Sequence, residues 1–259
     1  MKYLLQLAVL LCLAGCSPGP DAKGTKTNWL RLCPDTSAPL TGRNIGDATN
    51  RECETPGALI CESFEDPLLA EYGVAMNGEG LLALQDCVVF EGKTALARHS
   101  VDDLGATVRM PLPVPYSSGS IHLRARIYIS PDKALPAEVT LFALRPQSDF
   151  SDDQISIRFN GEGHYSLQVG KTEVASSEPG LVEQGSWVCL EAALDLSGLG
   201  QGSLSIDGKE VLRLMGAQLP DGVDGYNIAT VFGGVSNPEG YFEMVVDDYV
   251  LATQPIGCE

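Results

Sequence analysis

Short runs in which apolar and polar residues alternate recur along the chain from Ala58 onward. In SIHLRARIYI, residues 120–129, the apolar side chains fall on one face and the polar ones on the other, because successive side chains of a strand point to opposite sides. WVCLEAALDL at 187–196 follows the same pattern, whereas EVTLFAL at 138–144 is apolar on both faces and is expected to be a central strand. Gly, Pro, Asn and Asp separate these runs at intervals typical of a sandwich or barrel.

A two-residue turn and the lack of helical periodicity both favour an all-β fold. Asp207-Gly208 lies between SLSI and KEVLRL, and this dipeptide favours a hairpin because a type I′ turn needs positive φ at both central positions. No apolar pattern with the helical period lasts beyond a turn or two, apart from a short candidate helix at Pro67 to Glu71. The sequence therefore predicts an all-β, two-sheet antiparallel sandwich over residues 58–259.

The first and last runs of this domain are expected to pair with each other. ALICESF at 58–64 and YFEMVVDDYVLATQPIGC at 241–258 would lie antiparallel in one sheet, because a sandwich closes when its end strands meet. In the last run the alternation places Asp247 and Asp248 on opposite faces, so one of them must lie inward or be satisfied by a partner.

The residues before this domain suggest export. Lys2 is followed by an apolar run to Ala14, which is typical of a secretory signal and too short to span a hydrocarbon core of ~30 Å. The next stretch is rich in Pro, Gly, Ser and Lys, which favours a flexible tether. The predicted organisation is a signal peptide at 1–15, a tether at 16–28, an irregular cysteine-containing segment at 29–57 and the β domain at 58–259.

The charge balance excludes one class of partner. Lys and Arg total 17 against 34 Asp and Glu, a formal net charge of −17. Such a surface repels nucleic acid and other polyanions, so no nucleic-acid partner is expected.

Six of the eight cysteines follow residue 16, and an even number in an exported chain suggests three disulfides. The expected pairs are Cys33 with Cys53, Cys61 with Cys258, and Cys87 with Cys189. Only the second follows from topology, since it joins the two strands that are expected to meet. A zinc site is disfavoured because no C-x-x-C occurs and the three histidines are scattered.

The signal peptide ends in a motif with a specific resemblance. Leu13-Ala14-Gly15-Cys16 resembles the lipobox of bacterial lipoproteins, which implies cleavage before Cys16 and acylation of that cysteine. Ser17 is not the aspartate that in enteric bacteria marks inner-membrane retention, so the resemblance implies a lipid anchor in the outer membrane. The alternative is an ordinary signal peptide with an incidental cysteine.

Six motifs together resemble the concanavalin-A-like, or laminin G-like, jelly roll of bacterial secreted lipoproteins. They are CESFED at 61–66, GKTALAR at 92–98, HLRARIYI at 122–129, GSWVCLEAALD at 185–195, the SIDGKEV hairpin, and VDDYVLATQPIGC at the end. The resemblance implies two curved antiparallel sheets whose concave face, in relatives, binds or cleaves polysaccharide.

The same resemblance implies a structural calcium ion where the first and last strands meet. Glu65 or Asp66, the backbone near Gly92, and Asp247 or Asp248 would supply the oxygen ligands that Ca²⁺ prefers. The alternative is an aspartate held by hydrogen bonds alone.

The polar face of 120–129 is the most suggestive candidate site. His122, Arg124, Arg126 and Tyr128 offer a cation to neutralise a uronate carboxylate and a group to move the neighbouring proton, as a polysaccharide lyase requires. Jelly-roll alginate lyases carry Q-I-H and Y-F-K-A-G motifs, and this chain departs from them at Ser120 and Glu243.

Two other groups of residues bear on the choice between hydrolysis and sugar binding. The E-x-D-x-x-E strand of glucanases with this fold is absent, and the pairs Glu191 with Asp195 and Glu243 with Asp247 are each roughly 13 Å apart along a strand, too far for glycoside hydrolysis. Trp187 would either stack on a sugar ring or pack beside a disulfide at Cys189.

These observations predict a lipid-anchored surface protein with a non-catalytic, glycan-binding concave sheet. The ligand-binding residues would be His122, Arg124, Arg126, Tyr128 and Glu191. The first alternative is a polyuronate lyase that uses the same row for β-elimination, and the second is a structural or adhesive module that binds protein.

Overall fold

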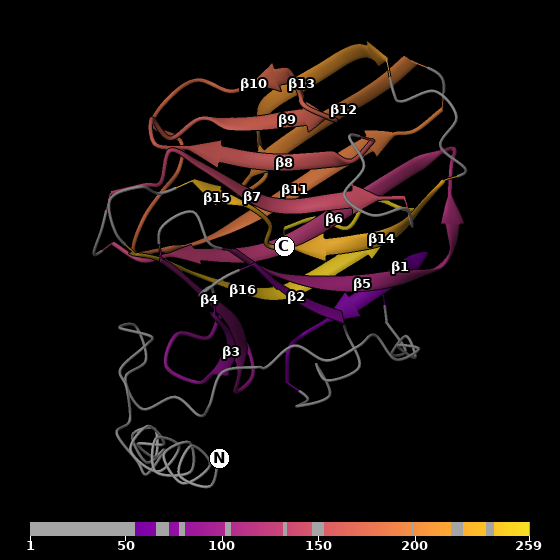
Figure 1. Cartoon of the computed structure of the whole chain (residues 1–259). Helices are drawn as coiled ribbons and strands as arrows, with labels where there is room; N and C mark the ends of the chain where they lie inside the picture. Colours follow the sequence, from indigo (N-terminus) through magenta and orange to yellow (C-terminus); the bar gives the residue numbers. More distant parts are fainter. Residues whose placement is uncertain are drawn as a thin grey trace, which may run out of the picture.

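The computed structural model describes residues 55–65, 73–77, 81–101, 105–131, 134–146, 153–197, 199–218, 225–236 and 241–258. All the secondary structure in these ranges is β-strand, arranged as two antiparallel sheets stacked in two layers (Figure 1). The all-β sandwich is therefore confirmed. The candidate helix at Pro67 to Glu71, the segment before residue 55, and Cys16 lie outside the described residues. In the part of the chain that is described, no helix is long and apolar enough to cross a membrane.

Sheet A contains the end strands of the domain. In spatial order its strands are β13 (Lys209–Gln218), β12 (Leu199–Ile206), β11 (Trp187–Asp195), β6 (Ser120–Ile129), β16 (Tyr241–Ala252), β4 (Ala95–Val101) and β3 (Leu81–Gln85). The remaining strand, β1 (Ala58–Glu62), pairs antiparallel with the end of β16. The predicted meeting of first and last strands is confirmed.

Sheet B forms the second layer. In spatial order its strands are β10 (Thr172–Ser176), β9 (Tyr165–Val169), β8 (Ile155–Asn160), β7 (Glu138–Arg145), β14 (Tyr226–Val231), β5 (Gly105–Tyr116) and β2 (Gly73–Asn77), and the short β15 (Val235–Ser236) pairs with β7. As predicted, the strand that is apolar on both faces lies centrally, and a register shift in it sets both Leu141 and Phe142 against the core.

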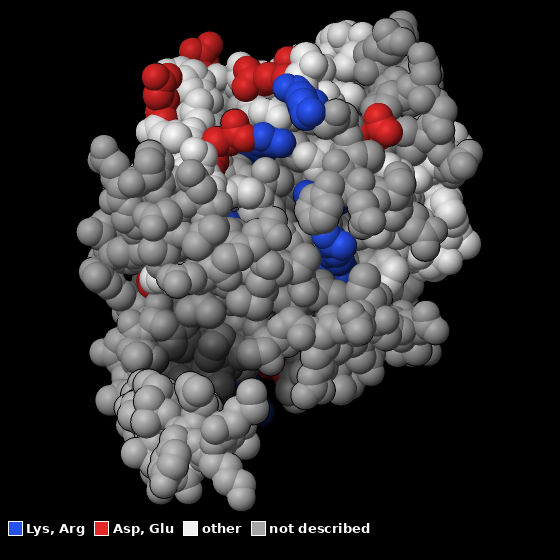
Figure 2. Space-filling model, in the orientation of Figure 1, with Lys and Arg blue, Asp and Glu red and all other residues white. Residues whose placement is uncertain are grey.

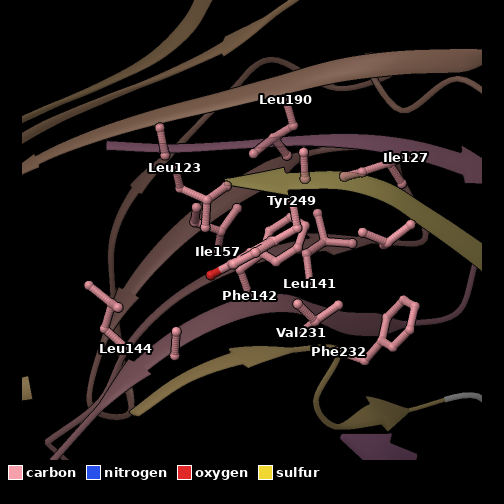
Figure 3. Packing of buried hydrophobic residues seen from close by; sticks show 14 of the residues in the cluster. Leu123, Ile127, Leu141, Phe142, Leu144, Ile157, Leu190, Val231, Phe232 and Tyr249 are labelled. Atoms are coloured by element: carbon pink, nitrogen blue, oxygen red, sulfur yellow. The ribbon is translucent and has the colours of Figure 1, made fainter. Parts of the chain in front are cut away.

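The core lies between the two sheets and is built from their inner faces. Leu123, Ile127 and Leu190 come from sheet A and meet Phe142, Leu144, Ile157 and Val231 from sheet B (Figure 3). In β6 the inward residues are 0–8% exposed, as the period-two alternation predicts. The Asp207-Gly208 hairpin also forms, with φ of 49° and 75° at its two central residues.

The predicted disulfide pairs are wrong for Cys61 with Cys258 and for Cys87 with Cys189. Cys61 lies opposite Val250 within the β1–β16 pair, and the chain beyond Ala252 runs back over the outer face of sheet A. That course brings Cys258 to Cys189, with their Cα atoms 5.9 Å apart in a disulfide. Cys61 and Cys87 are also disulfide-bonded. The expected Cys33–Cys53 pair lies outside the described residues.

One charged side chain lies inside the core. Arg98 on β4 faces inward beside Met244 and has no exposed surface. Its Nε donates to Ser100 Oγ at 2.7 Å, and its guanidinium carbon lies 5.7 Å from the centre of the Phe232 ring. Its Nη1 and Nη2 have no hydrogen-bond partner among the described residues. Burial lowers the pKa of Arg98 to about 9, which shows that this site disfavours the charged form.

We predict that Arg98→Met stabilises the protein. Methionine fills a similar volume without a buried charge, so the free energy of unfolding should rise by about 1–4 kcal/mol. Urea denaturation of the full chain would measure this. The control is Arg213→Met, at an arginine whose side chain is 63% exposed, where a change within about 0.5 kcal/mol is expected. A destabilised Arg98→Met variant would contradict the prediction.

Candidate functional site

The structure places the predicted row of polar residues together on the outer face of sheet A. His122, Arg124, Arg126 and Tyr128 alternate along β6 with the core residues, and Glu191 on β11 lies directly opposite Arg124. The geometric part of the prediction is thus confirmed. What these side chains contact differs from the expectation.

The C-terminal segment after β16 occupies most of this row. Arg124 Nη1 donates to the Gly257 carbonyl oxygen at 3.3 Å, and Arg126 Nη2 donates to the Cys258 carbonyl oxygen at 3.0 Å. Glu191 Oε1 accepts the Gly257 amide at 2.8 Å. The two arginines and the glutamate therefore hold the end of the chain in place, and the disulfide to Cys189 fastens it.

An aromatic cluster occupies the other end of the row. The ring of Trp187 lies 5.7 Å from that of Tyr128 and 5.8 Å from that of Phe90, in tilted and edge-on contacts. The guanidinium of Arg126 lies over Phe90, 4.3 Å from its centre. These contacts answer the question left open for Trp187, which packs beneath the loop between β3 and β4 next to the disulfide-bonded Cys189.

The carboxylates expected to bind calcium make other contacts. Glu65 Oε1 accepts the amides of Lys93 and Thr94 at 2.7 and 3.0 Å, and these backbone hydrogen bonds lower the pKa of Glu65. Asp247 Oδ2 accepts the amides of Phe90 and Glu91. Both carboxylates thus fix the loop between β3 and β4.

Asp248 binds an arginine instead. Its Oδ1 accepts Arg124 Nη2 at 2.9 Å. Within the described ranges, no three or more His, Cys, Asp or Glu side chains are grouped so as to hold a metal ion. Asp66, another of the expected ligands, lies outside the described residues, so the calcium site stays a prediction.

A register shift within β16 also changes the predicted sides of the two aspartates. Asp248 adopts φ of 46°, and the pairing with β6 is interrupted between Asp247 and Val250. As a result Tyr249 and Leu251 face the core in place of Asp248 and Val250. Neither aspartate is driven inward, because the bulge turns the strand after Asp247.

Sheet B carries a different polar surface on its outer face. Arg109 on β5, Arg145 on β7 and Arg158 on β8 all alternate with buried core residues and so point away from the core. A lateral row of paired residues crosses the sheet between them, in the order Arg109, Thr230, Ala143, Ser156, Gln168. We call Arg109, Arg145 and Arg158 the arginine cluster.

The arginine cluster is half-buried and surrounded by small polar groups. Arg158 Nε donates to Ser156 Oγ at 3.1 Å, and its Nη1 pairs with Glu138. Thr230 and Ser156, between the arginines, are buried although they face outward. On the face seen in Figure 2, described basic side chains lie both toward the middle and near the upper edge, where most of the described acidic side chains gather.

Arg145 lies close enough to Arg109 and Arg158 to be affected by their charges. The pKa of Arg145 is lowered, first by burial and then by the charges of Arg109 and Arg158. A negative charge placed beside Arg145 would favour its charged form. Planar guanidinium groups also match carboxylates in bidentate geometry. The arrangement is suited to binding an anion that carries several carboxylates.

The sequence analysis did not find the arginine cluster. Its members are far apart in the sequence, and β14, which lies between β5 and β7, comes from residues 226–231. No local spacing signals this order of strands. The signal available was the alternation of each arginine with apolar neighbours, as in Val108 and Met110 around Arg109.

Comparisons with solved structures find this fold in other proteins. An endo-beta-1,4-glucuronan lyase from the fungus Trichoderma reesei matches with a TM-score of 0.54 and 16% identity over 70% of this chain and 90% of that one. Cip1, a cellulose induced protein, matches with a TM-score of 0.55 and 16% identity over 77% and 100%. The alginate lyase Aly36B matches with a TM-score of 0.51 and 10% identity over 71% and 87%.

No protein-family model matches the sequence, and no curated protein matches it. At these identities the structural likeness establishes the fold, a jelly-roll sandwich of two antiparallel sheets.

We predict that the C-terminal disulfide stabilises the domain and keeps the tail on sheet A. Replacing Cys189 and Cys258 together by alanine should lower the free energy of unfolding by about 2–4 kcal/mol, because the unfolded chain loses a long closed loop. Thermal and urea unfolding would measure this. Hydrogen exchange at the Gly257 amide should speed up in the variant, and an unchanged rate would show that the hydrogen bonds to Arg124, Arg126 and Glu191 hold the segment without the disulfide.

We predict that His122 titrates below the ordinary histidine range. Burial lowers its pKa, and the nearby charge of Glu191 offsets part of that effect. Since the unfolded chain then binds the proton more tightly, the contribution of His122 to stability falls as the pH drops below about 6.5. NMR titration should show a further decrease in the pKa of His122 in Glu191→Gln. An increase would contradict the assignment.

Proposed function

We propose that the chain binds an anionic, uronate-containing polysaccharide on the outer face of sheet B, without cleaving it. The observation that carries this proposal is the arginine cluster, in which Arg109, Arg145 and Arg158 share one face of three strands. The formal net charge of −17 disfavours polyanions over most of the surface. The three arginines would form a local positive patch on that surface, to which carboxylates could bind.

The likeness to solved structures favours a sugar polymer as the ligand of the cluster. Ser156 is itself buried and accepts a hydrogen bond from Arg158 Nε, so it orients that arginine. Structures with the same fold include proteins whose names state that they act on glucuronan and alginate. A glycan partner is therefore the class of ligand that both the site and the likeness support.

Binding without catalysis is favoured by the groups beside the cluster. β-Elimination requires a group that removes and returns a proton. Strands β7 and β8 contain no histidine, lysine or tyrosine. His164, in the turn after β8, uses Nδ1 toward the Ser177 carbonyl oxygen and Nε2 toward Glu162. A lyase remains the second candidate, because two of the structures with this fold bear that name.

We also propose the lipid anchor on Cys16 and export to the outer membrane. The support is the Leu13-Ala14-Gly15-Cys16 motif in the sequence. Labelling with a radioactive fatty acid, compared with a Cys16→Ser variant, tests this part independently of ligand binding.

We predict that the chain binds polyglucuronate, alginate or polygalacturonate more tightly than cellulose oligomers. Arg145→Ala should weaken binding of the acidic polymer about tenfold to a hundredfold, the size expected when one charged hydrogen-bonding group is lost. Isothermal titration calorimetry on the full chain would measure it. The matched control is Lys209→Ala, which removes an exposed cation from sheet A and should leave binding unchanged.

Two results would overturn the proposal. The first is equal binding of neutral and acidic polymers. The second is unchanged binding of the acidic polymer both in Arg145→Ala and in the double variant that also carries Arg109→Ala. Release of an ultraviolet-absorbing unsaturated sugar from any of the acidic polymers would instead establish the lyase.

A further inference from the structure

The outer face of sheet A contains a groove beyond the region covered by the C-terminal segment. It has a volume of about 220 Å³ and crosses β6, β11, β12 and β13. Its lining residues are Ser120, Ala193, Leu194, Asp195, Gln201, Gly202, Ser203, Arg213, Leu214 and Met215. None of the roles assigned above uses this groove.

The groove exists because small residues lie between larger ones on adjacent strands. Ala193, Ser203 and Arg213 are lateral neighbours in one row, and Asp195, Gln201 and Met215 in the next. The space at Gly202 is also restricted, since a Cβ there would lie 2.9 Å from Leu194 Cδ2 and 3.0 Å from the Ala193 carbonyl oxygen. Small side chains thus form the floor, and long ones form the walls.

The charged walls are held in fixed positions by neighbours. Glu210 accepts Arg213 Nε at 2.8 Å and Nη2 at 2.6 Å, a fork that uses one edge of the guanidinium. Asp195 Oδ1 accepts the Ser197 amide at 2.9 Å and its hydroxyl, and these hydrogen bonds lower the pKa of Asp195. The remaining edge of each group is available to a ligand.

The chemistry of the walls is mixed and nearly balanced in charge. Donors come from Arg213 and acceptors from Asp195, while Gln201 and Ser203 supply both. Met215 is 70% exposed and adds an apolar surface at one side. An anion gains little here because Glu210 already pairs with Arg213. The set matches a ligand with many hydroxyl groups, no net charge and one apolar face.

We propose that this groove binds a single uncharged sugar residue. The ring face would lie against Met215, and adjacent hydroxyls would bond to Asp195 and Arg213. The site differs from the arginine cluster in sheet, in charge and in ligand, so it does not rest on binding of acidic polymers.

To test this, the full chain is titrated with glucose, galactose, mannose, xylose and their β-linked oligomers. Binding is measured from changes in the NMR chemical shifts of the protein. Saturable binding in the millimolar range is expected for at least one of these sugars. Ser203→Leu, which fills the floor, should weaken that binding at least about tenfold. The matched control is Ser205→Leu, two residues along the same face of β12 and outside the groove, which should bind like the unmodified chain.

Further variants separate this site from the arginine cluster. Asp195→Asn keeps the shape of the groove and should also weaken binding of the neutral sugar, whereas Arg145→Ala should not. Ser203→Leu in turn should leave binding of acidic polymers unchanged. The proposal is overturned if no neutral sugar binds saturably, or if Ser203→Leu binds the sugar as tightly as Ser205→Leu while both variants unfold at the same temperature as the unmodified chain.

Discussion

The cost of burying a carboxylate determines how sheet A closes. Strand β16 pairs with β6 on one side, and on the other with β4 along its first half and β1 at its end. A regular strand would have placed Asp248 in the core between these partners. The bulge after Asp247 avoids that burial, turns Tyr249 inward, and leaves both carboxylates to bond outside. At this bulge the partner of β16 on that side changes from β4 to β1.

Both aspartates at the bulge also help to cover the outer face of sheet A. Asp247 accepts amides of the loop between β3 and β4, and Asp248 pairs with Arg124, which holds the C-terminal segment. The loop and the segment each contain a disulfide-bonded cysteine, Cys87 and Cys258. Much of this face is therefore occupied by the chain itself, whereas the arginine cluster of sheet B faces away from it.

The period of two in the sequence was sufficient to predict the strands at 120–129 and 187–196 with their inward faces, and the closure of a sandwich predicted the pairing of the two ends. Buried residues of β6 and the hairpin at Asp207-Gly208 follow from local pattern and local turn chemistry alone. The disulfides did not follow, because the direction of residues 253–258 depends on hydrogen bonds with Arg124, Arg126 and Glu191. Those same contacts occupy three of the five residues that were predicted to bind a ligand.

The arginine cluster could not be predicted for a different reason. Its members come from three strands, and their proximity depends on β14 entering sheet B between β5 and β7, which no local sequence feature encodes. Alternation with apolar neighbours is compatible with an outward-facing arginine, but it does not say which outer faces are continuous. The same limit applies to the groove over Ala193 and Ser203, whose existence depends on strand register.

The stacking of the two sheets back to back has a consequence for any assembly built from this domain. Outer faces of a sandwich point in opposite directions, so the arginine cluster and the groove of sheet A open toward different neighbours. A molecule that binds an acidic saccharide on one sheet and a neutral saccharide on the other would link two polysaccharide chains of different composition. In a matrix that contains both kinds of polysaccharide, binding at one site would raise the effective concentration of ligand at the other. Two weak contacts would then be enough for firm adhesion.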